Sequence, residues 1–204
     1  MTPLELLLAH PTMVRLARAL DGQPGRIVRP DVPVRHAATA ATLRLGTAGP
    51  ELLLIRRALQ EHDPWSGHVA WPGGRQERED ADLAATAVRE TREETGLDLS
   101  RDGRILGTLD DIHPRSPQLP PIVVRPFVAA LGGRAPVVQN EELAGHLWVP
   151  VDALLDEQNW GSAPILIRGL GTEDRPVFSY ADFQVWGMTE YMLRQLVGLL
   201  RGPG

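Results

Sequence analysis

The chain has 204 residues, a formal net charge of −5, 43% hydrophobic and 23% charged residues, and no cysteine. This balance is typical of a folded domain with a substantial core; it excludes fibrous proteins, disulfides and thiolate metal sites, and argues against a generally basic nucleic-acid-binding surface. No apolar run reaches the roughly 20 residues of a membrane span, and the N-terminus lacks the basic region of a signal peptide, so we expect a cytoplasmic protein without a membrane partner.

The first 35 residues are predicted to form a helical extension and a linker. Leucine and valine recur at helical spacing over residues 3–20, and Pro11 interrupts the pattern, so we expect the helix to break or restart there. Residues 21–33 are rich in glycine and proline, as linkers are. We therefore divide the chain into an extension at 1–35 and a main domain at 36–204. The amphipathic extension would allow a homodimer.

From residue 36 onward, predicted strands and helices are mixed. Apolar stretches bounded by turn residues predict strands at 38–45, 52–55, 69–71, 104–112, 122–131, 147–149, 165–167 and 177–180. Helical periodicity predicts helices at about 80–95, 151–155 and 186–201. We expect the first two strands to form a hairpin, the last two to pair, and Gly96 to end the first of these helices. Such a mixture predicts a layered α/β or α+β domain.

The predicted helix at about 80–95 carries three carboxylates on one arc. Glu90, Glu93 and Glu94 fall within about 100° of each other, beside a stripe of small residues. Glu90 and Glu94 are four residues apart, where two like charges cost about 0.2–0.5 kcal/mol. Arg89 can reach Glu93, but one arginine cannot neutralise three glutamates, whereas a divalent cation with oxygen ligands can. The alternative is a solvated charged face, which is what three glutamates on a helix usually indicate.

The turn Pro72-Gly73-Gly74 precedes this helix, and its glycines allow the backbone to approach another group closely. A carbonyl from the turn could add an oxygen ligand. Mg²⁺ usually binds one or two carboxylates plus substrate phosphates. Such an ion polarises a phosphoryl group and lowers the pKa of water, and a spare carboxylate can accept the proton. These residues therefore predict a metal site suited to phosphoanhydride hydrolysis.

Residues 73–97, GGRQEREDADLAATAVRETREETGL, resemble the Nudix box, G-x5-E-x7-R-E-U-x-E-E-x-G-U, in which U is bulky and apolar. The positions that match in register are Arg89, Glu90, Glu93, Glu94, Gly96 and Leu97. The segment departs from the box in three ways. It has one extra residue between Gly74 and Arg89, it has Asp80 at the early glutamate, and it has Thr91 at the first apolar position.

The longer spacing and Asp80 resemble the coenzyme A pyrophosphatase-like subgroup of Nudix hydrolases. Stretches outside the box are similar as well, and the likeness extends over roughly residues 36–200; these stretches are 52–56, 67–74, 140–143, 147–150 and 185–189. Three departures fall where substrate choice is expected. Arg57 stands at a serine position of the subgroup, and Asp63 and Trp65 stand at a basic and a histidine position.

The resemblance implies a Nudix α/β/α sandwich with a mixed central sheet, carrying the N-terminal helical extension. It also implies Mg²⁺ or Mn²⁺ as the cofactor. The groups expected to hold the metal are Glu90, Glu93, Glu94 and the carbonyl of Gly73. Arg89 would orient Glu93 or Glu90.

The resemblance also implies residues around the metal. Many Nudix proteins use a distal carboxylate as a ligand or base, for which Glu142 is our candidate and Glu141 the second choice. Asp80 and Glu77 would hold the metal-binding glutamates in position without contacting the metal themselves.

Five residues are candidates for binding substrate. Arg56, Arg57 and Arg75 flank the predicted site and would grip phosphates, or they are surface charges. Trp65 would stack on a base, and His68 would contact substrate or pack against its neighbours.

The reaction that the resemblance implies is attack of water on the pyrophosphate of a nucleoside diphosphate linked to another moiety. The first substrate guess is coenzyme A or its derivatives, and ADP-ribose, NADH or a dinucleoside polyphosphate is the alternative. Two other classes stay open: a non-catalytic nucleotide-sensing Nudix module, and a scaffold in which the glutamates only solvate a helix.

Overall fold

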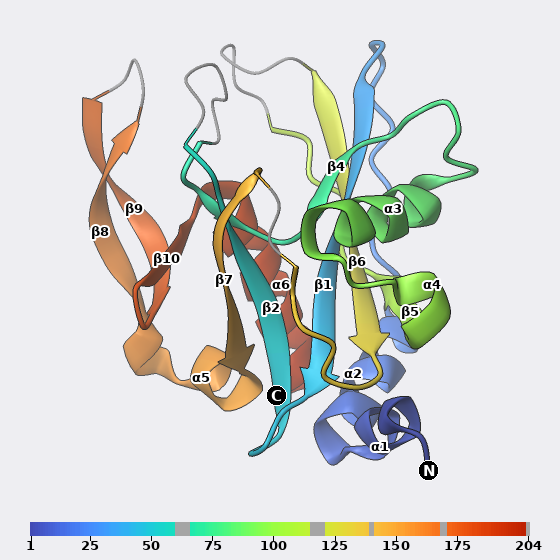
Figure 1. Ribbon diagram of the computed structural model, residues 1–204. Coiled ribbons are helices and arrows are strands. Elements are labelled where there is room, and N and C mark those ends of the chain that lie inside the picture. The colour runs from blue at the N-terminus through green and yellow to red at the C-terminus, as the bar shows by residue number, and fades with distance from the viewer. Residues whose placement is uncertain (60–65, 115–120, 139–140, 168–170, 203–204) are drawn as a thin grey trace.

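The structure is a computed structural model that describes residues 1–59, 66–114, 121–138, 141–167 and 171–202. Its main sheet is built from β1 Arg35–Leu45, β2 Pro50–Arg57, β3 Val69–Ala70, β4 Gly73–Arg75, β5 Gly103–Thr108, β6 Ile122–Leu131 and β7 Leu143–Pro150. The strand order is β3-β2-β1-β6-β5, with β4 paired to β1 and β7 paired to β2 (Figure 1). β1 and β6 run parallel and the other pairs antiparallel, so the sheet is mixed, as expected.

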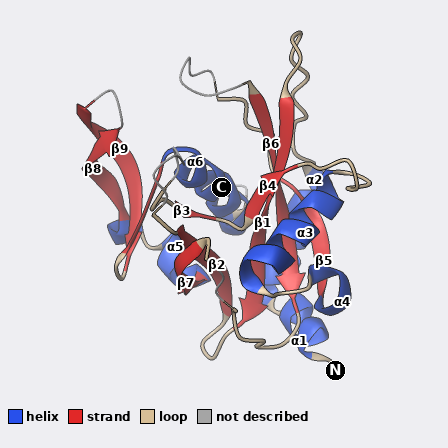
Figure 2. Cartoon of the chain, turned by 45° about the horizontal axis from the view of Figure 1, so that its top comes forward, coloured by secondary structure: helices blue, strands red, loops and turns tan. Residues whose placement is uncertain are grey.

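Helices cover both faces of this sheet (Figure 2). One face carries α3 Leu83–Thr95 and α4 Leu99–Asp102. The other carries α1 Pro3–Ala9, α2 Pro11–Gly22, α5 Val151–Leu155 and α6 Gly187–Arg201. The run Leu52 to Ile55 in β2 is fully buried, because successive side chains enter the two apolar layers in turn. This α/β/α arrangement confirms the predicted fold class.

The N-terminal helices belong to the same core as the rest of the chain. His10 ends α1 and begins α2, accepting a hydrogen bond from Thr12 N on its ring, so the helix restarts at Pro11 as predicted. Leu7, Met13 and Leu16 are fully buried, in one cluster with side chains of α6. The division at residue 35 stays a prediction. The homodimer expectation rests on the apolar side of these N-terminal helices. In the structure that side packs against the chain's own sheet and α6.

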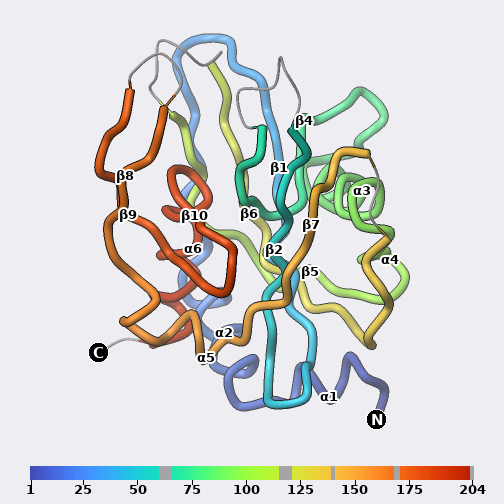
Figure 3. The backbone as a smooth tube through the Cα atoms, turned by 60° about the vertical axis from the view of Figure 1, so that its left-hand side comes forward, coloured from blue at the N-terminus to red at the C-terminus, as the bar shows by residue number. Residues whose placement is uncertain are grey.

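A second, smaller sheet stands apart from the first. It is formed by β8 Trp160–Ile167, β9 Gly171–Tyr180 and β10 Phe183–Trp186, in the order β10-β9-β8, and β8 follows the short 3-10 turn Glu157–Asn159. Figure 3 shows α6 between the two sheets. Val185 and Phe178 of the small sheet are fully buried against this helix layer. The small sheet therefore closes the α6 side of the molecule.

Several predicted elements differ in extent. The strand expected over 104–112 ends at Thr108, and Ile112 forms only an isolated bridge to Val124. β8 and β9 do pair, but 165–167 face 171–173, and Val177 faces Gly161. Most side chains of this hairpin are exposed or half-buried, so the apolar pattern marked only fragments of the strands. β4 and β10 were not predicted because each is too short to show a pattern.

Candidate active site

The helix that carries the three glutamates begins and ends as its sequence dictates. Asp82 caps its first turn by accepting a hydrogen bond from Ala85 N at 2.8 Å. Gly96 ends it in the left-handed region, with φ of 73°. Thr91, at a position where the Nudix box has an apolar residue, is buried, and its hydroxyl donates to Ala87 O at 2.7 Å. Because that hydroxyl is satisfied within the helix, a polar residue is tolerated there.

Arg89 is the centre of the polar cluster beside this helix. Its Nε and Nη2 each donate to one carboxylate oxygen of Asp80 at 2.9 Å. Nη1 donates to Glu90 Oε1 at 3.0 Å and to Glu93 Oε2 at 2.9 Å, and Nη2 also donates to Arg75 O at 2.9 Å. All five N–H groups of the guanidinium are thus used, and its side chain is only 16% exposed. Arg89 therefore contacts both glutamates that it was expected to orient.

Asp80 is the strongest partner of Arg89. Thr86 Oγ1 and Glu77 N each donate to Asp80 Oδ2 at 2.9 Å, and the Asp80 side chain is 5% exposed. The hydrogen bonds from Arg89 hold the pKa of Asp80 well below its usual range and raise the pKa of Arg89. The Glu77 carboxylate lies farther away, 3.9 Å from Arg89 Nη1. The predicted support of the glutamate cluster is thus formed mainly by Asp80, with Thr86 as a partner that the sequence did not reveal.

Glu94 is buried against the glycine turn. Its residue is 2% exposed, its Oε2 accepts a hydrogen bond from Gly73 N at 2.9 Å, and its Oε1 lies 3.5 Å from Arg57 Nη1. Burial raises the pKa of Glu94 to about 7, although Gly73 and Arg57 favour the charged form. A carboxylate held in this way needs a further positive partner to be fully ionised at neutral pH.

Glu90 faces the second glycine of the turn. A Cβ atom at Gly74 would lie 2.4 Å from Glu90 Oε1, so only glycine leaves room for this carboxylate. Burial raises the pKa of Glu90, and the charges of Glu93 and Glu142 raise it further. The charge of Glu142 also raises the pKa of Glu94. The distal carboxylate expected from the resemblance is therefore electrostatically coupled to both helix glutamates.

The cluster fits a divalent cation, though not as a closed cage. No three acidic or histidine side chains in the described part of the chain are placed to hold one ion together. Glu93 is 52% exposed on its side chain and is turned toward Arg89. Glu90 and Glu94 remain as two desolvated carboxylates beside Gly73-Gly74, and Mg²⁺ commonly takes one or two carboxylates and completes its shell with waters and phosphates. Burial raises the pKa of both carboxyl groups, and a bound cation would favour their charged forms.

The candidate phosphate-binding arginines do not all reach the site. Successive side chains of β2 point to opposite faces, so Arg57 approaches Glu94 while Arg56 points away. Arg56 Nη2 instead donates to Asp182 Oδ2 at 2.9 Å, and its guanidinium lies over the Phe183 ring at 4.4 Å. Arg56 thus contacts the β9–β10 turn, and its assignment as a phosphate ligand stays a prediction.

The remaining candidate residues also differ in what their side chains contact. Arg75 is exposed on its side chain, and its backbone carbonyl is the group that contacts Arg89. The His68 ring lies 4.5 Å from that of Trp186 at the start of α6, a partner that the sequence did not indicate. Trp65 lies outside the described residues. The amide of Gly73 contacts Glu94, and a role for its carbonyl stays a prediction.

The comparisons with known proteins agree on one protein family. The model of the NUDIX domain matches residues 34–168. The mitochondrial coenzyme A diphosphatase NUDT8 of Homo sapiens is 31% identical over 195 residues, which cover 94% of this chain and 78% of that protein. The uncharacterized Nudix hydrolase NudL of Yersinia pestis is 33% identical over 151 residues, or 72% of this chain and 71% of NudL. An uncharacterized protein of Schizosaccharomyces pombe is 32% identical, and the matched part spans 46% of its length.

Solved structures agree on the fold. The NUDIX hydrolase from Alicyclobacillus acidocaldarius superposes with a TM-score of 0.53 at 22% identity, covering 82% of this chain and 93% of that one. The MutT NUDIX hydrolase from Burkholderia pseudomallei gives a TM-score of 0.51 at 21% identity, covering 80% and 98%. The mixed sheet between helices, with a glycine turn facing a helix that bears carboxylates, agrees with the family model and with relatives that are Nudix hydrolases. The chain belongs to the Nudix hydrolase family.

Proposed function

We propose that the chain hydrolyses the pyrophosphate of a nucleoside diphosphate linked to another moiety, with Mg²⁺ or Mn²⁺, and that its substrate is coenzyme A or a derivative. The observation that carries this proposal is the convergence of Glu90 and Glu94, both desolvated, on the Gly73-Gly74 turn. A merely solvated helix face would leave these carboxylates in water with ordinary pKa values.

A divalent cation, when bound, polarises the phosphoryl group and lowers the pKa of water. Glu90 and Glu94 would hold it, with Glu93 and the Gly73 carbonyl as further candidates. Arg89 fixes the position of Glu90 through its hydrogen bond at 3.0 Å. Arg57, beside Glu94, would bind a phosphate oxygen of the substrate.

Glu142 is the proposed general base. Its charge acts on both Glu90 and Glu94, and its side chain comes from outside the helix, so it can face the water that attacks phosphorus. Glu142 would accept the proton as the water oxygen forms its bond to phosphorus. The bond from phosphorus to the bridging oxygen then breaks, and the proton passes to the departing phosphate. Glu141, which precedes Glu142 in the chain and is likewise exposed, is the matched control.

Coenzyme A is favoured as substrate by the similarity to human NUDT8, a coenzyme A diphosphatase, over 94% of this chain. The motifs outside the Nudix box support the same class. Arg57 at the subgroup's serine position adds a positive charge beside Glu94 that a serine would not supply. The cytoplasmic location and the homodimer stay predictions. No helix in the described residues is long and apolar enough to cross a membrane.

The test is a substrate panel read by mass spectrometry, with Mg²⁺ or Mn²⁺. The panel contains coenzyme A, acetyl-coenzyme A, NADH, ADP-ribose, diadenosine polyphosphates and nucleoside triphosphates. We expect adenosine 3′,5′-bisphosphate and 4′-phosphopantetheine from coenzyme A. Cleavage of another compound alone would reassign the substrate, and nucleotide binding without any product would favour the sensing module.

Two variants tie the activity to the site. Glu142→Gln should lower kcat by roughly 10²–10⁴-fold, the usual contribution of a general base. Glu141→Gln, an exposed neighbour, should retain full activity. Equal activity of the two variants would refute the assignment of the base.

A further inference from the structure

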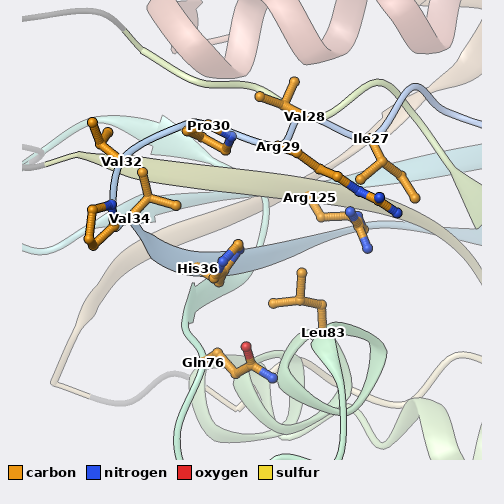
Figure 4. A pocket seen from close by; sticks show the side chains of 11 residues that line it. Ile27, Val28, Arg29, Pro30, Val32, Val34, His36, Gln76, Leu83 and Arg125 are labelled. Carbon is orange, nitrogen blue, oxygen red and sulfur yellow. The ribbon is translucent and has the colours of Figure 1, made fainter.

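A pocket of about 580 Å³ lies near the candidate active site and is lined by none of its glutamates. Residues 27–34, which we call the strap, form one wall of the pocket (Figure 4). The other walls are formed by His36 of β1, Arg125 of β6 and Leu83, the first residue of α3. Its volume falls in the range of about 300–1,000 Å³ that is usual for small-molecule sites. The pocket is large enough for part of a nucleotide.

The strap is fastened at both ends. Val28 N donates to Asp111 Oδ2 at 3.0 Å, and Asp111 N donates to Arg26 O at 2.9 Å. At the other end, where β1 begins, Arg35 N donates to Pro121 O at 2.9 Å. The wall of the pocket is therefore held in place by backbone hydrogen bonds on either side of it.

Two guanidinium groups, one of them paired with Asp111, lie in the pocket. Arg29 of the strap and Arg125 line it, and Figure 4 shows their guanidinium ends directed to the same part of it. Arg125 Nε and Nη2 each donate to Asp111 at 2.8 Å, which fixes this guanidinium and leaves three of its five N–H donors for other partners. Arg29 forms no ion pair within the described ranges of the chain, and none of the described lining residues is acidic. Two guanidinium groups in one pocket suit an anion with several oxygens.

The rest of the lining is largely apolar. Ile27 and Val32 of the strap are 55% and 56% exposed, and Leu83 of α3 lies across from them. Apolar walls with a few placed polar groups are usual where a flat organic ligand binds. A nucleoside that bears a phosphate monoester combines both properties.

We propose that this pocket binds the nucleoside end of the substrate through a phosphate monoester on its ribose, with Arg29 and Arg125 as the specificity-determining residues. The inference rests on the proposed function. Leu83 and Glu90 are seven residues apart, hence on the same side of α3 and about 10 Å from each other along its axis. Gln76, which also lines the pocket, follows β4, whose Gly74 faces Glu90. Pocket and glutamates therefore lie along one edge shared by β4 and α3.

The experiment measures binding without catalysis. Adenosine 3′,5′-bisphosphate and AMP are titrated by calorimetry into the full chain in the absence of divalent cations and at fixed ionic strength. We expect the bisphosphate to bind more tightly than AMP. Arg29→Ala should weaken binding of the bisphosphate by about tenfold, as loss of a charged hydrogen bond does, and should leave AMP binding unchanged. Arg18→Ala, which removes an exposed arginine on α2, is the matched control and should change neither affinity.

Equal affinity for the two probes in the unmodified protein would overturn the proposal. So would equal affinity of Arg29→Ala and Arg18→Ala for the bisphosphate. An inactive protein that still binds the bisphosphate through Arg29 would refute the proposed function and keep the pocket. If Arg29→Ala hydrolyses coenzyme A with an unchanged KM, the proposed function stands and the role of the pocket is refuted.

Discussion

Asp80 and Arg89 form a two-pronged ion pair, in which Arg89 Nε and Nη2 each lie 2.9 Å from a carboxylate oxygen of Asp80. The pair joins the loop before α3 to the face of the helix that bears Glu90 and Glu93. Asp80 thus locks the guanidinium whose remaining N–H groups hold those two glutamates.

Arg89→Lys should destabilise the protein and lower its activity together. Lysine keeps the charge but cannot bridge both oxygens of Asp80 while also contacting Glu90. Because Asp80 is only 5% exposed, loss of its partner should cost about 3 kcal/mol of unfolding free energy, as measured by urea denaturation. Arg92→Lys, at an exposed position of the same helix, should change neither property. Similar behaviour of the two variants would contradict the central place of Arg89.

The Asp80–Arg89 pair also predicts a pH dependence of stability. The pKa of Asp80 is lowered in the folded protein from its ordinary value of 3.8, so at acidic pH the unfolded chain binds a proton that the folded chain does not. Stability from this pair is therefore present above about pH 4 and is lost as the pH falls further. The difference in unfolding free energy between the unmodified protein and Asp80→Asn should shrink between pH 6 and pH 3. A constant difference would show that the pair contributes nothing through charge.

Gly74→Ala should separate activity from folding. The added methyl group would meet Glu90 Oε1 at 2.4 Å, and because that atom ends a flexible side chain, the carboxylate can move aside. We expect the fold to persist and turnover to fall by at least tenfold. Gly73→Ala would instead meet the carbonyl of Ala38 at 2.4 Å and should unfold this region. Circular dichroism and kcat distinguish the two results, and full activity of Gly74→Ala would mean that Glu90 need not occupy its present position.

A divalent cation should stabilise the protein through Glu94. A cation at 100 times its Kd adds about 2.7 kcal/mol to the unfolding free energy when it binds only the folded state. Addition of Mg²⁺ or Mn²⁺ should therefore raise the Tm of the unmodified protein and of Glu141→Gln. In Glu94→Gln we expect little rise and almost no turnover. An equal rise in Tm in Glu94→Gln would place the ion elsewhere.

Local patterns predicted the framework of the fold. The helix predicted over about 80–95 begins at Leu83, because Asp82 caps it, and it ends at Gly96 as the preference of glycine for the left-handed region predicts. The apolar run of β2 is buried on both faces, and this shows as an unbroken hydrophobic stretch. The register of β8 with β9 did not follow, because both strands are largely exposed and carry no alternation that would fix it.

The site was predictable to the extent that it lies on one helix. The contact of Arg89 with Glu93 follows from their spacing of four residues. The position of Asp80 depends on the path of the loop before α3. The position of Gly74 depends on the pairing of β4 with β1. Helical periodicity predicts neither of these features. The difference between Arg56 and Arg57 could have been inferred from the alternation of side chains along a strand.

The packing of α2 against α6 has a consequence for how the molecule is made. The N-terminal helices and α6 share one apolar cluster on the same face of the main sheet, so each covers part of the hydrophobic side of the other. α2 spans Pro11–Gly22 and α6 spans Gly187–Arg201, so this contact joins segments that are far apart in the sequence and is slow to form. A variant in which α6 cannot fold would therefore expose apolar side chains of α1 and α2 and should aggregate.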